Sequence, residues 1–217
     1  MAATARKTAA GAETRNAFLD ATAALMTERG TIDIPLSQIA ERAGANIALV
    51  SYHFGGKEGL LLALARRNAD EALAQAEALM AREMPPADKM RRHLTGVIAT
   101  FHRYPYLYAL LAALLQDPAS PSARAVSGFF AEPLAAMQAR LLAAIAPGMD
   151  AMHFHFAAIG ACANIFMQRA TLRAVFGIGD VDDVLCRRFT ETTVAMLMDG
   201  ILNQPATRPA DESGRVS

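Results

Sequence analysis

Four side chains that could recognise a nucleic acid recur at helical spacing in the first quarter of the chain. At about 100° per residue, one face of a short predicted helix carries Ala48, Leu49, Tyr52 and His53. The apolar residues can contact thymine methyl groups, and the phenolic hydroxyl and imidazole can reach phosphates or base edges. The pattern favours contact with the major groove of double-stranded DNA.

A preceding helix is predicted by apolar residues at i, i+3, i+4 and i+7, which are Leu36, Ile39, Ala40 and Ala43. Gly44 ends this helix. The two short helices, joined by a tight turn, form a predicted helix-turn-helix.

The second of these helices has a candidate N-terminal cap and an apolar side that we expect to be buried. The side-chain oxygen of Asn46 can accept from the free N–H groups of the first turn. We expect Ile47, Val50 and Phe54 to lie on the buried side, which leaves the face described above outside.

Three polar residues are candidates for phosphate contacts. Lys57 follows two glycines and begins the next helix, where the helix dipole disfavours a cation unless an anion lies nearby. Ser37 and Gln38 lie in the first turn of the preceding helix, whose N–H groups can hold a phosphate.

From about residue 15 to residue 60 the chain resembles the DNA-binding domain of the tetracycline-repressor (TetR) family of bacterial regulators. The matching motifs, in order, are Ile39-Ala40 with Ala43-Gly44, Tyr52-His53-Phe54, and Lys57-Glu58 with Leu60. Two positions depart from the family pattern. Val50-Ser51 replaces a Leu-Tyr pair, so Tyr52 is the candidate for the phosphate contact of that tyrosine. Asn46 opens a segment that differs from the family's, so the base preference is not carried over.

The resemblance implies an all-α homodimer with two domains. We expect an N-terminal DNA-binding helix-turn-helix head of three helices at 1–58 and a helical-bundle domain for ligand binding and dimerisation at 59–202. The last two helices carry more apolar surface than a monomer can easily bury. In the family these helices of two subunits pair into a four-helix bundle. We expect the tail at 203–217 to be disordered.

About nine helices are expected, because proline and glycine interrupt helical periodicity throughout the chain and no strand-like alternation occurs. Residues 1–12 lack periodicity and are expected to be a flexible arm. The predicted helices span 14–29, 36–43, 46–54, 57–84, 88–104, 106–116, 121–146 with a kink or new start at Pro133, 150–176 and 181–202.

Composition points to a soluble cytoplasmic protein. Hydrophobic residues make up 53% of the 217, yet no run is long and uncharged enough to span a membrane. The N-terminus lacks the apolar region of a secretion signal. Cys162 and Cys186 fit a reducing compartment and are expected to be small buried apolar residues.

The charge balance is unusual for a protein that binds DNA. The net charge is zero, and residues 1–60 carry six basic and six acidic side chains, which cancel. A nucleic-acid-binding surface is normally basic. We therefore expect few phosphate contacts per subunit and a moderate dependence of DNA affinity on salt.

Aromatic, methionine and polar residues across the middle helices are candidates for an effector pocket, which in the family lies in this region. Apolar walls with a few polar groups suit a small-molecule site, although plain core packing would give the same pattern. The candidates are His93, Phe101, His102, Tyr108, Phe129, Phe130, Met137, Asn164, Met167 and Gln168.

Metal and enzyme chemistry find no support in the sequence. His153 and His155 point about 200° apart on a helix and cannot share an ion. His93 and His102 align but lack a nearby carboxylate pair. Neither a catalytic motif nor a cofactor-binding motif is present, so we expect no enzyme, cofactor or metal.

We interpret the chain as a sequence-specific regulator of transcription that binds a pseudo-palindromic operator as a homodimer. The resemblance to the family favours a repressor that a small-molecule effector of unknown identity releases from the operator. The alternative is an all-α small-molecule-binding or scaffolding protein with a vestigial helix-turn-helix, which the neutral charge and Ser51 allow.

Overall fold

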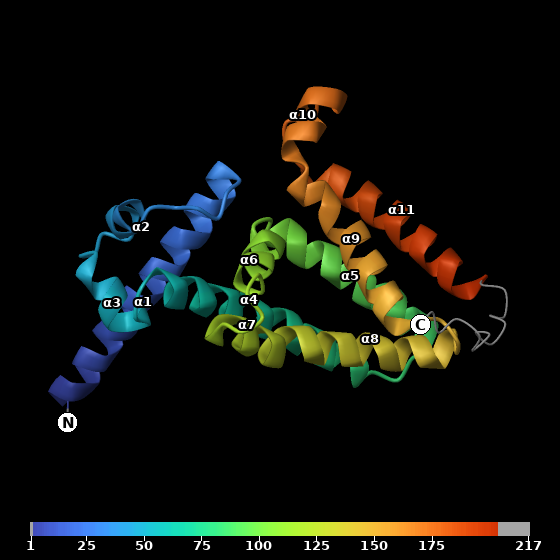
Figure 1. The fold of residues 1–217 in the computed structure, drawn as a ribbon, viewed down its shortest axis with the longest axis horizontal. Coiled ribbons are helices and arrows are strands. Elements are labelled where there is room, and N and C mark those ends of the chain that lie inside the picture. Colours follow the sequence, from blue (N-terminus) through green and yellow to red (C-terminus); the bar gives the residue numbers. More distant parts are fainter. Residues whose placement is uncertain (1, 204–217) are drawn as a thin grey trace, which may run out of the picture.

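A computed structural model of the chain describes residues 2–203, and the surroundings of side chains from Gly11 to Asn203. All regular secondary structure in this part is helical (Figure 1), which confirms the all-α prediction. The first helices are α1 (Ala2–Arg29), α2 (Leu36–Arg42), α3 (Ala48–Phe54), α4 (Lys57–Met80), α5 (Pro86–Arg103) and α6 (Leu107–Leu114). They are followed by α7 (Pro121–Val126), the π-helical turn η1 (Ser127–Ala131), α8 (Glu132–Ile145), α9 (Ala151–Met167), α10 (Arg169–Phe176) and α11 (Asp183–Leu202).

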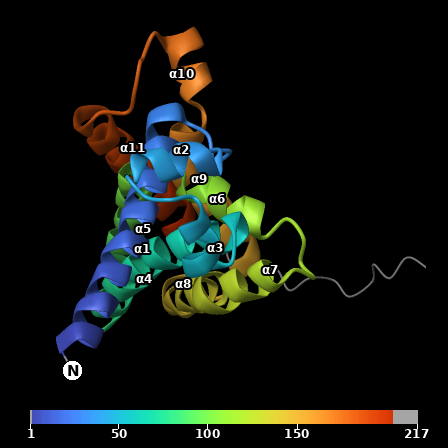
Figure 2. The same cartoon turned by 90° about the vertical axis from the view of Figure 1, so that its left-hand side faces the viewer.

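Helices α1 to α3 form a head at one end of the molecule (Figures 1 and 2). Its centre contains Phe18, Ile34, Ile39 and Val50, which have no solvent-exposed surface. The rings of Phe18 and Phe54 meet edge to face with centroids 6.2 Å apart. These apolar contacts fix α3 against α1, so α3 is held as a rigid projection of the head.

The remaining helices form a body around α5, which packs against α4, α8, α9 and α11. Met90, Leu94 and Ile98 of α5 are completely buried. Helix α4 runs from the head into the body (Figure 1), and its buried residues include Leu60, near the head, and Ala76, within the body. Within residues 2–203, no helix is long and apolar enough to cross a membrane.

The structure corrects three expected boundaries. Residues 2–12 are the first turns of α1, so the expected flexible arm is wrong; alanine-rich sequence favours helix without an apolar period. Helix α4 ends at Met80, and Pro86 begins α5 because proline suits a first helical turn. The expected helix 150–176 is interrupted at Gln168, whose φ and ψ of −97° and 35° are not helical. Of the expected disordered tail, residues 204–217 lie outside the described part.

The predicted helix 121–146 is divided by the π-helical turn η1. Pro133 follows this turn and lies in the first turn of α8. A proline within a continuous α-helix lacks an N–H and clashes with the carbonyl four residues earlier, whereas a π-helical turn widens the backbone locally. The wide turn lets the chain continue in nearly the same direction. The kink or new start that was predicted at Pro133 is therefore a π-helical turn followed by a new α-helix.

Gly59, in the first turn of α4, is a point of close approach between α3 and α4. A Cβ atom at this position would lie 1.8 Å from the backbone carbonyl oxygen of Phe54. We expect Gly59→Ala to separate the two helices and lower the free energy of unfolding by more than about 2 kcal/mol, measured by urea denaturation. Gly96→Ala is the control, because no atom lies within 4 Å of its added Cβ. An unchanged unfolding midpoint for Gly59→Ala would contradict the contact.

Candidate DNA interface and effector pocket

Helix α3 presents an uncharged outer face. Tyr52 is 80% exposed, and Asn46 and Ala48 are also exposed. Asn46 Oδ1 accepts a hydrogen bond from the Ala48 N–H at 2.8 Å, so this side chain caps the helix start. Leu49 is partly buried against the hydrophobic core and offers less surface than the other three. Tyr52 is therefore the side chain of this helix that reaches furthest into solvent.

His53 of α3 and Ile47, the residue before α3, are buried to a different extent than expected. His53 is partly buried and close to α1, because a Cβ atom at Gly11 would lie 3.9 Å from His53 Cε1. Its ring meets that of Tyr52 edge to face with centroids 5.0 Å apart. Ile47 is 46% exposed, so its expected burial is wrong. His53 thus supports Tyr52 from the α1 side, whereas Ile47 adds apolar surface to the outer face.

The three candidates for phosphate contacts differ in their exposure and in the partners that their side chains already have. Ser37 is exposed in the first turn of α2. The Gln38 side-chain oxygen accepts a hydrogen bond from Arg29. Lys57 Nζ donates to Asp33 Oδ1 at 2.8 Å, and this hydrogen bond and the ammonium charge lower the pKa of Asp33. Lys57 already has an anion beside it, so phosphate would have to compete with Asp33.

Other cations of the head also have partners. The Arg42 guanidinium pairs with the carboxylate of Glu28. Arg15 lies over the ring of Phe54, with 5.2 Å from its guanidinium carbon to the ring centroid. The described part of the head therefore has little uncompensated positive charge.

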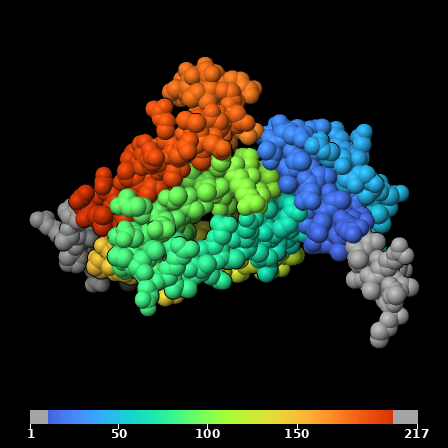
Figure 3. Space-filling model, turned by 180° about the vertical axis from the view of Figure 1, so that it is seen from behind, coloured from blue at the N-terminus to red at the C-terminus, as the bar shows by residue number. Residues whose placement is uncertain are grey.

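A cavity of about 650 Å³ lies in the body among α4, α5, α6, η1, α8 and α9. Its walls are mainly apolar, and its volume falls in the range of small-molecule sites. Of the predicted pocket residues, the structure places four on its wall: His93, Phe101, Tyr108 and Phe130. The body is visibly hollowed between α4 and α5 when seen from behind (Figure 3).

The other predicted pocket residues lie away from this cavity. His102 Nε2 lies 3.0 Å from a carboxylate oxygen of Asp183 on α11. Phe129 lies under the Arg66 guanidinium, and Met137 is partly buried in α8. Asn164 and Gln168 border a separate open groove between α9, α10 and α11, whereas Met167 is 47% exposed.

The cavity wall that α4 contributes was not predicted from the sequence. Leu73, Ala76 and Leu79 of α4 line the cavity, together with Leu134 of α8 and Ile159 of α9. The three α4 residues recur every third position, which is a helical face. This spacing could have identified them as a wall of the cavity.

A chain of three buried or partly buried polar side chains crosses the cavity wall. Gln138 Nε2 donates to His93 Nε2 at 3.0 Å, and Gln138 Oε1 accepts from His155 Nδ1 at 2.6 Å. Burial, with a smaller contribution from the nearby His155, lowers the pKa of His93 to about 4. Burial also lowers the pKa of His155. Both imidazoles are therefore neutral at pH 7, and the chain adds polarity to the wall without charge.

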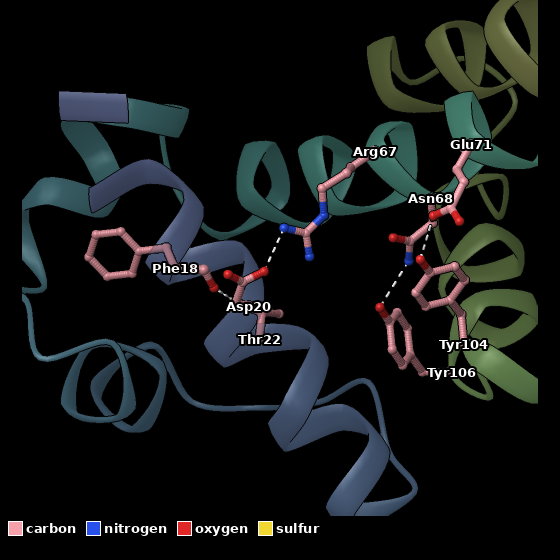
Figure 4. A network of polar contacts seen from close by, with 8 residues as sticks. All are labelled: Phe18, Asp20, Thr22, Arg67, Asn68, Glu71, Tyr104 and Tyr106. Atoms are coloured by element: carbon pink, nitrogen blue, oxygen red, sulfur yellow. Dashed lines mark hydrogen bonds and ion pairs between the residues drawn. The ribbon is translucent and has the colours of Figure 1, made fainter. Parts of the chain in front are cut away.

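Polar contacts connect the head to the body through α4 (Figure 4). Arg67 Nη1 donates to Asp20 of α1 at 2.7 Å. One residue further, the buried Asn68 donates to the Tyr106 hydroxyl at 2.9 Å, at the start of α6. Tyr104 donates to Glu71 at 2.6 Å, and burial is the main cause that raises the pKa of Tyr104. Adjacent turns of α4 thus hold both the head and the α5–α6 corner.

Two further contacts join the head to the body at positions away from the centre of α4. Ser122 of α7 donates to the Glu58 carboxylate in the first turn of α4. Arg169, at the start of α10, donates to the Thr27 carbonyl oxygen at 3.1 Å, near the end of α1. A cation is favourable at this end of a helix. The position of the head therefore depends on α7 and α10 as well as on α4.

Metal-binding geometry is not found in the described residues, which hold no group of three or more His, Cys, Asp or Glu side chains able to bind an ion. His153 is exposed and lies 3.7 Å from Asp150. Both cysteines are buried, and burial raises the pKa of the Cys162 thiol to about 12. This thiol stays protonated at neutral pH.

Comparison with known proteins identifies the family. Residues 18–64 match the model of the tetR family of bacterial regulatory proteins, and residues 83–206 match that of the tetracyclin repressor-like C-terminal domain. The second match alone covers more than half of the chain. The chain therefore belongs to the TetR family, as the motifs in the head predicted, and this family consists of transcriptional regulators.

Individual relatives agree over shorter stretches. The chain is 33% identical over 76 residues to the HTH-type transcriptional regulator BetI of Brucella anthropi, which is 35% of this chain and 39% of that protein. BetI of Rhizobium meliloti is also 33% identical over 76 residues, or 35% and 37% of the two chains. The aligned stretch spans about two fifths of the length of these curated relatives.

Solved structures share the fold over nearly the whole chain. The TetR-family regulator SCO4454 of Streptomyces coelicolor superposes with a TM-score of 0.66 at 20% identity, covering 88% of this chain and 95% of that one. The Bacillus subtilis regulator FadR, in complex with stearoyl-CoA, gives 0.64 at 14% identity, covering 85% and 97%. At these identities the likeness establishes the fold alone.

The buried His93 should make stability depend on pH. Because its folded-state pKa of about 4 lies below the ordinary 6.5, the unfolded chain binds more protons between these values. We expect His93 to reduce the free energy of unfolding by up to about 3 kcal/mol as the pH falls from 7 to 4. Urea denaturation at several pH values measures this loss, and His93→Gln should flatten the curve, whereas the exposed His153→Gln should not. Equal pH profiles for His93→Gln and the parent would contradict the assignment.

Proposed function

We propose that the protein is a sequence-specific DNA-binding transcriptional regulator that acts as a homodimer. It is a repressor, and a small-molecule effector in the body releases it from a pseudo-palindromic operator. The observation that carries this proposal is the outer face of α3, where Tyr52 is 80% exposed while Val50 on the opposite side has no exposed surface. A rigid helix with one uncharged outer face suits insertion into the major groove.

The proposed DNA contacts combine groove and backbone. Asn46, Ala48, Leu49 and Tyr52 lie in or beside the groove, and His53 supports Tyr52 from the α1 side. Ser37, Gln38 and Lys57 contact phosphates. Lys57 exchanges Asp33 for phosphate on binding, which limits the net gain in attraction and keeps the salt dependence moderate.

Exposed apolar side chains of α9 and α11 support a homodimer. Phe156 is 71% exposed, Met196 70%, Met152 58%, Val184 56% and Leu202 51%. Several large apolar side chains exposed on two neighbouring helices are typical of an association site. A two-fold dimer would place its two α3 helices in successive major grooves, about 34–36 Å apart along the DNA.

The effector acts by changing how the heads are spaced. Residues of α4 and α6 line the cavity, and the same helices carry the Asn68–Tyr106 hydrogen bond next to the Arg67–Asp20 ion pair. A ligand that shifts α6 against α4 therefore also shifts α1. To weaken operator binding tenfold, it must prefer the released conformer by about 1.4 kcal/mol.

The remaining assignments follow from this function. The DNA-binding head covers 1–58 and the effector and dimerisation domain covers 59–202. The protein works in the cytoplasm, where its operator is, and it catalyses no reaction. Relatives named BetI and the stearoyl-CoA complex of FadR differ too much along the chain to identify its effector.

A second candidate function is that of a scaffolding or small-molecule-binding protein whose head no longer reads DNA. The pairing of Lys57 with Asp33 and of Arg42 with Glu28 favours it, because these cations are already neutralised. Measurements of DNA binding distinguish the two functions.

Tyr52 provides the test of the DNA interface. We expect Tyr52→Ala to weaken binding to operator DNA at least about tenfold, since it removes the most exposed groove contact. Fluorescence anisotropy with DNA from upstream of its own gene, against scrambled competitor of equal length, measures the change. Tyr52→Phe retains the ring and isolates the hydroxyl. His53→Ala should weaken binding as well, by releasing Tyr52.

The outcome separates the two functions. Specific binding by the parent that is lost in Tyr52→Ala supports the regulator. If the parent selects no sequence from a random pool, the scaffold is correct. Specific binding that survives both Tyr52→Ala and His53→Ala would show that another surface reads the DNA.

Met196 provides the test of the dimer. A charge at this exposed position on α11 would be buried without a partner at the proposed interface, so we expect Met196→Glu to give a monomer. Analytical ultracentrifugation measures the mass. Ala136→Glu introduces the same charge on the exposed surface of α8 and should leave the dimer intact. A dimeric Met196→Glu protein would place the interface elsewhere.

A further inference from the structure

We propose that the cavity in the body binds an anionic amphiphile, a molecule with one apolar chain and a carboxylate or phosphate head group held by Arg82 and Arg92. This inference rests on the proposed function only in taking the cavity as the effector site. The class of ligand follows from the charges on the wall and from where they lie.

Arg82 and Arg92 are the charged residues of the cavity wall, which contains neither aspartate nor glutamate. Both arginines are exposed at the rim, and neither has an ion-pair partner among residues 11–203. Most cations of the head, in contrast, are paired or stacked. Two unpaired guanidinium groups beside an apolar cavity favour an anion, and their planar donors suit carboxylate and phosphate oxygens.

The two arginines lie at the same end of the cavity. Arg82 lies in the short connection between α4 and α5, and Arg92 lies in the second turn of α5. Arg92 is the cavity-lining residue of α5 nearest in sequence to this connection. This connection is at the end of α4 that lies away from the head (Figure 1). His93 and His155, joined through the buried Gln138, make the adjoining wall polar but uncharged.

The opposite end of the cavity is apolar. Phe101, at the far end of α5, and Leu107 and Leu111 of α6 line it. From Arg92 to Phe101 the helix rises by about 14 Å. A ligand with its anion on the arginines therefore needs a linear apolar chain to reach α6, the helix whose first turn is bonded to Asn68. Chain length becomes the property that decides whether the ligand contacts α6.

A cationic ligand is the competing class. Four aromatic side chains, Phe101, Tyr108, Phe130 and Phe156, line the cavity and could surround a quaternary ammonium group. Such a site gains from a nearby carboxylate, which this wall lacks, and the two arginines would repel the ligand. The wall therefore favours an anion over a cation of equal size.

Four probes with the same twelve-carbon chain test the class: dodecanoate, dodecyl phosphate, dodecanol and dodecyltrimethylammonium. Isothermal titration calorimetry on the full-length protein, below the micelle concentration of each probe, measures affinity without DNA. We expect one or both anions to bind at least about tenfold more tightly than dodecanol, and the cation to bind more weakly than dodecanol. Comparison of the two anions distinguishes a carboxylate source from a phosphate source. Equal binding of all four probes, or preference for the cation, would overturn the proposal.

Substitution of both arginines assigns the head-group site. Arg82→Ala with Arg92→Ala should lower the affinity for the preferred anion about tenfold and leave dodecanol unchanged. Arg91→Ala is the matched control, because Arg91 is exposed on the same helix and does not line the cavity. Unchanged anion affinity in the double variant would overturn the role of the arginines. Circular dichroism confirms that each variant is folded.

The assay also separates this inference from the proposed function. If the parent binds an operator specifically but prefers neither anion, the ligand class is wrong and the regulator remains. If an anion binds through the arginines while no DNA sequence is selected, the ligand class is correct and the regulator is wrong.

Discussion

The structure depends on one helix, α4, that is packed into the head at its start and into the body along its second half. The first half of α4 buries Leu60 and Leu64 without exposed surface, and the second half supplies Leu73 and Leu79 to the cavity wall. Because packed interiors respond to strain by discrete shifts, a helix that is packed into both the head and the body cannot tilt in one without disturbing the other. Residues 81–85 interrupt the helical chain, so α4 and α5 are separate helices. The end of α4 at the cavity can therefore move and transmit this movement along α4 to the head.

Buried polar groups give this arrangement its specificity. Asn68 is 1% exposed and Gln138 also 1%, and each forms hydrogen bonds to a side chain from another helix. An unpaired polar group at such a position would cost more than the bond itself contributes, so alternative packings of these helices are disfavoured. Apolar contacts make the body compact, whereas Asn68 and Gln138 determine which helices face each other. This division explains how the cavity can be mostly apolar and still have a defined shape.

The sequence was most informative where the structure is local. Helical spacing and Gly44 located α2 and α3, and the Asn46 cap formed as expected. Pairs distant in sequence could not be predicted from spacing: Lys57 with Asp33, and His53 beside the extended α1. Only four of the ten candidate pocket residues line the cavity, because aromatic residues mark a cavity wall but equally mark ordinary core. Asn164 and Gln168 are polar residues in an otherwise apolar segment, but both border the separate groove between α9, α10 and α11.

The π-helical turn at residues 127–131 has a consequence for how the cavity could change over evolution. Such a turn contains about one residue more than the α-helical path it replaces. Deleting one residue there would restore a regular α-helix and change which side chains the turn itself presents, while the helices on either side stay in place. A single codon loss would thereby exchange the side chains that η1 presents to the cavity, such as Phe130, while α8 kept its own contacts. Ligand preference in this fold can therefore change by the loss of one residue from the π-helical turn as well as by substitution of a residue on the cavity wall.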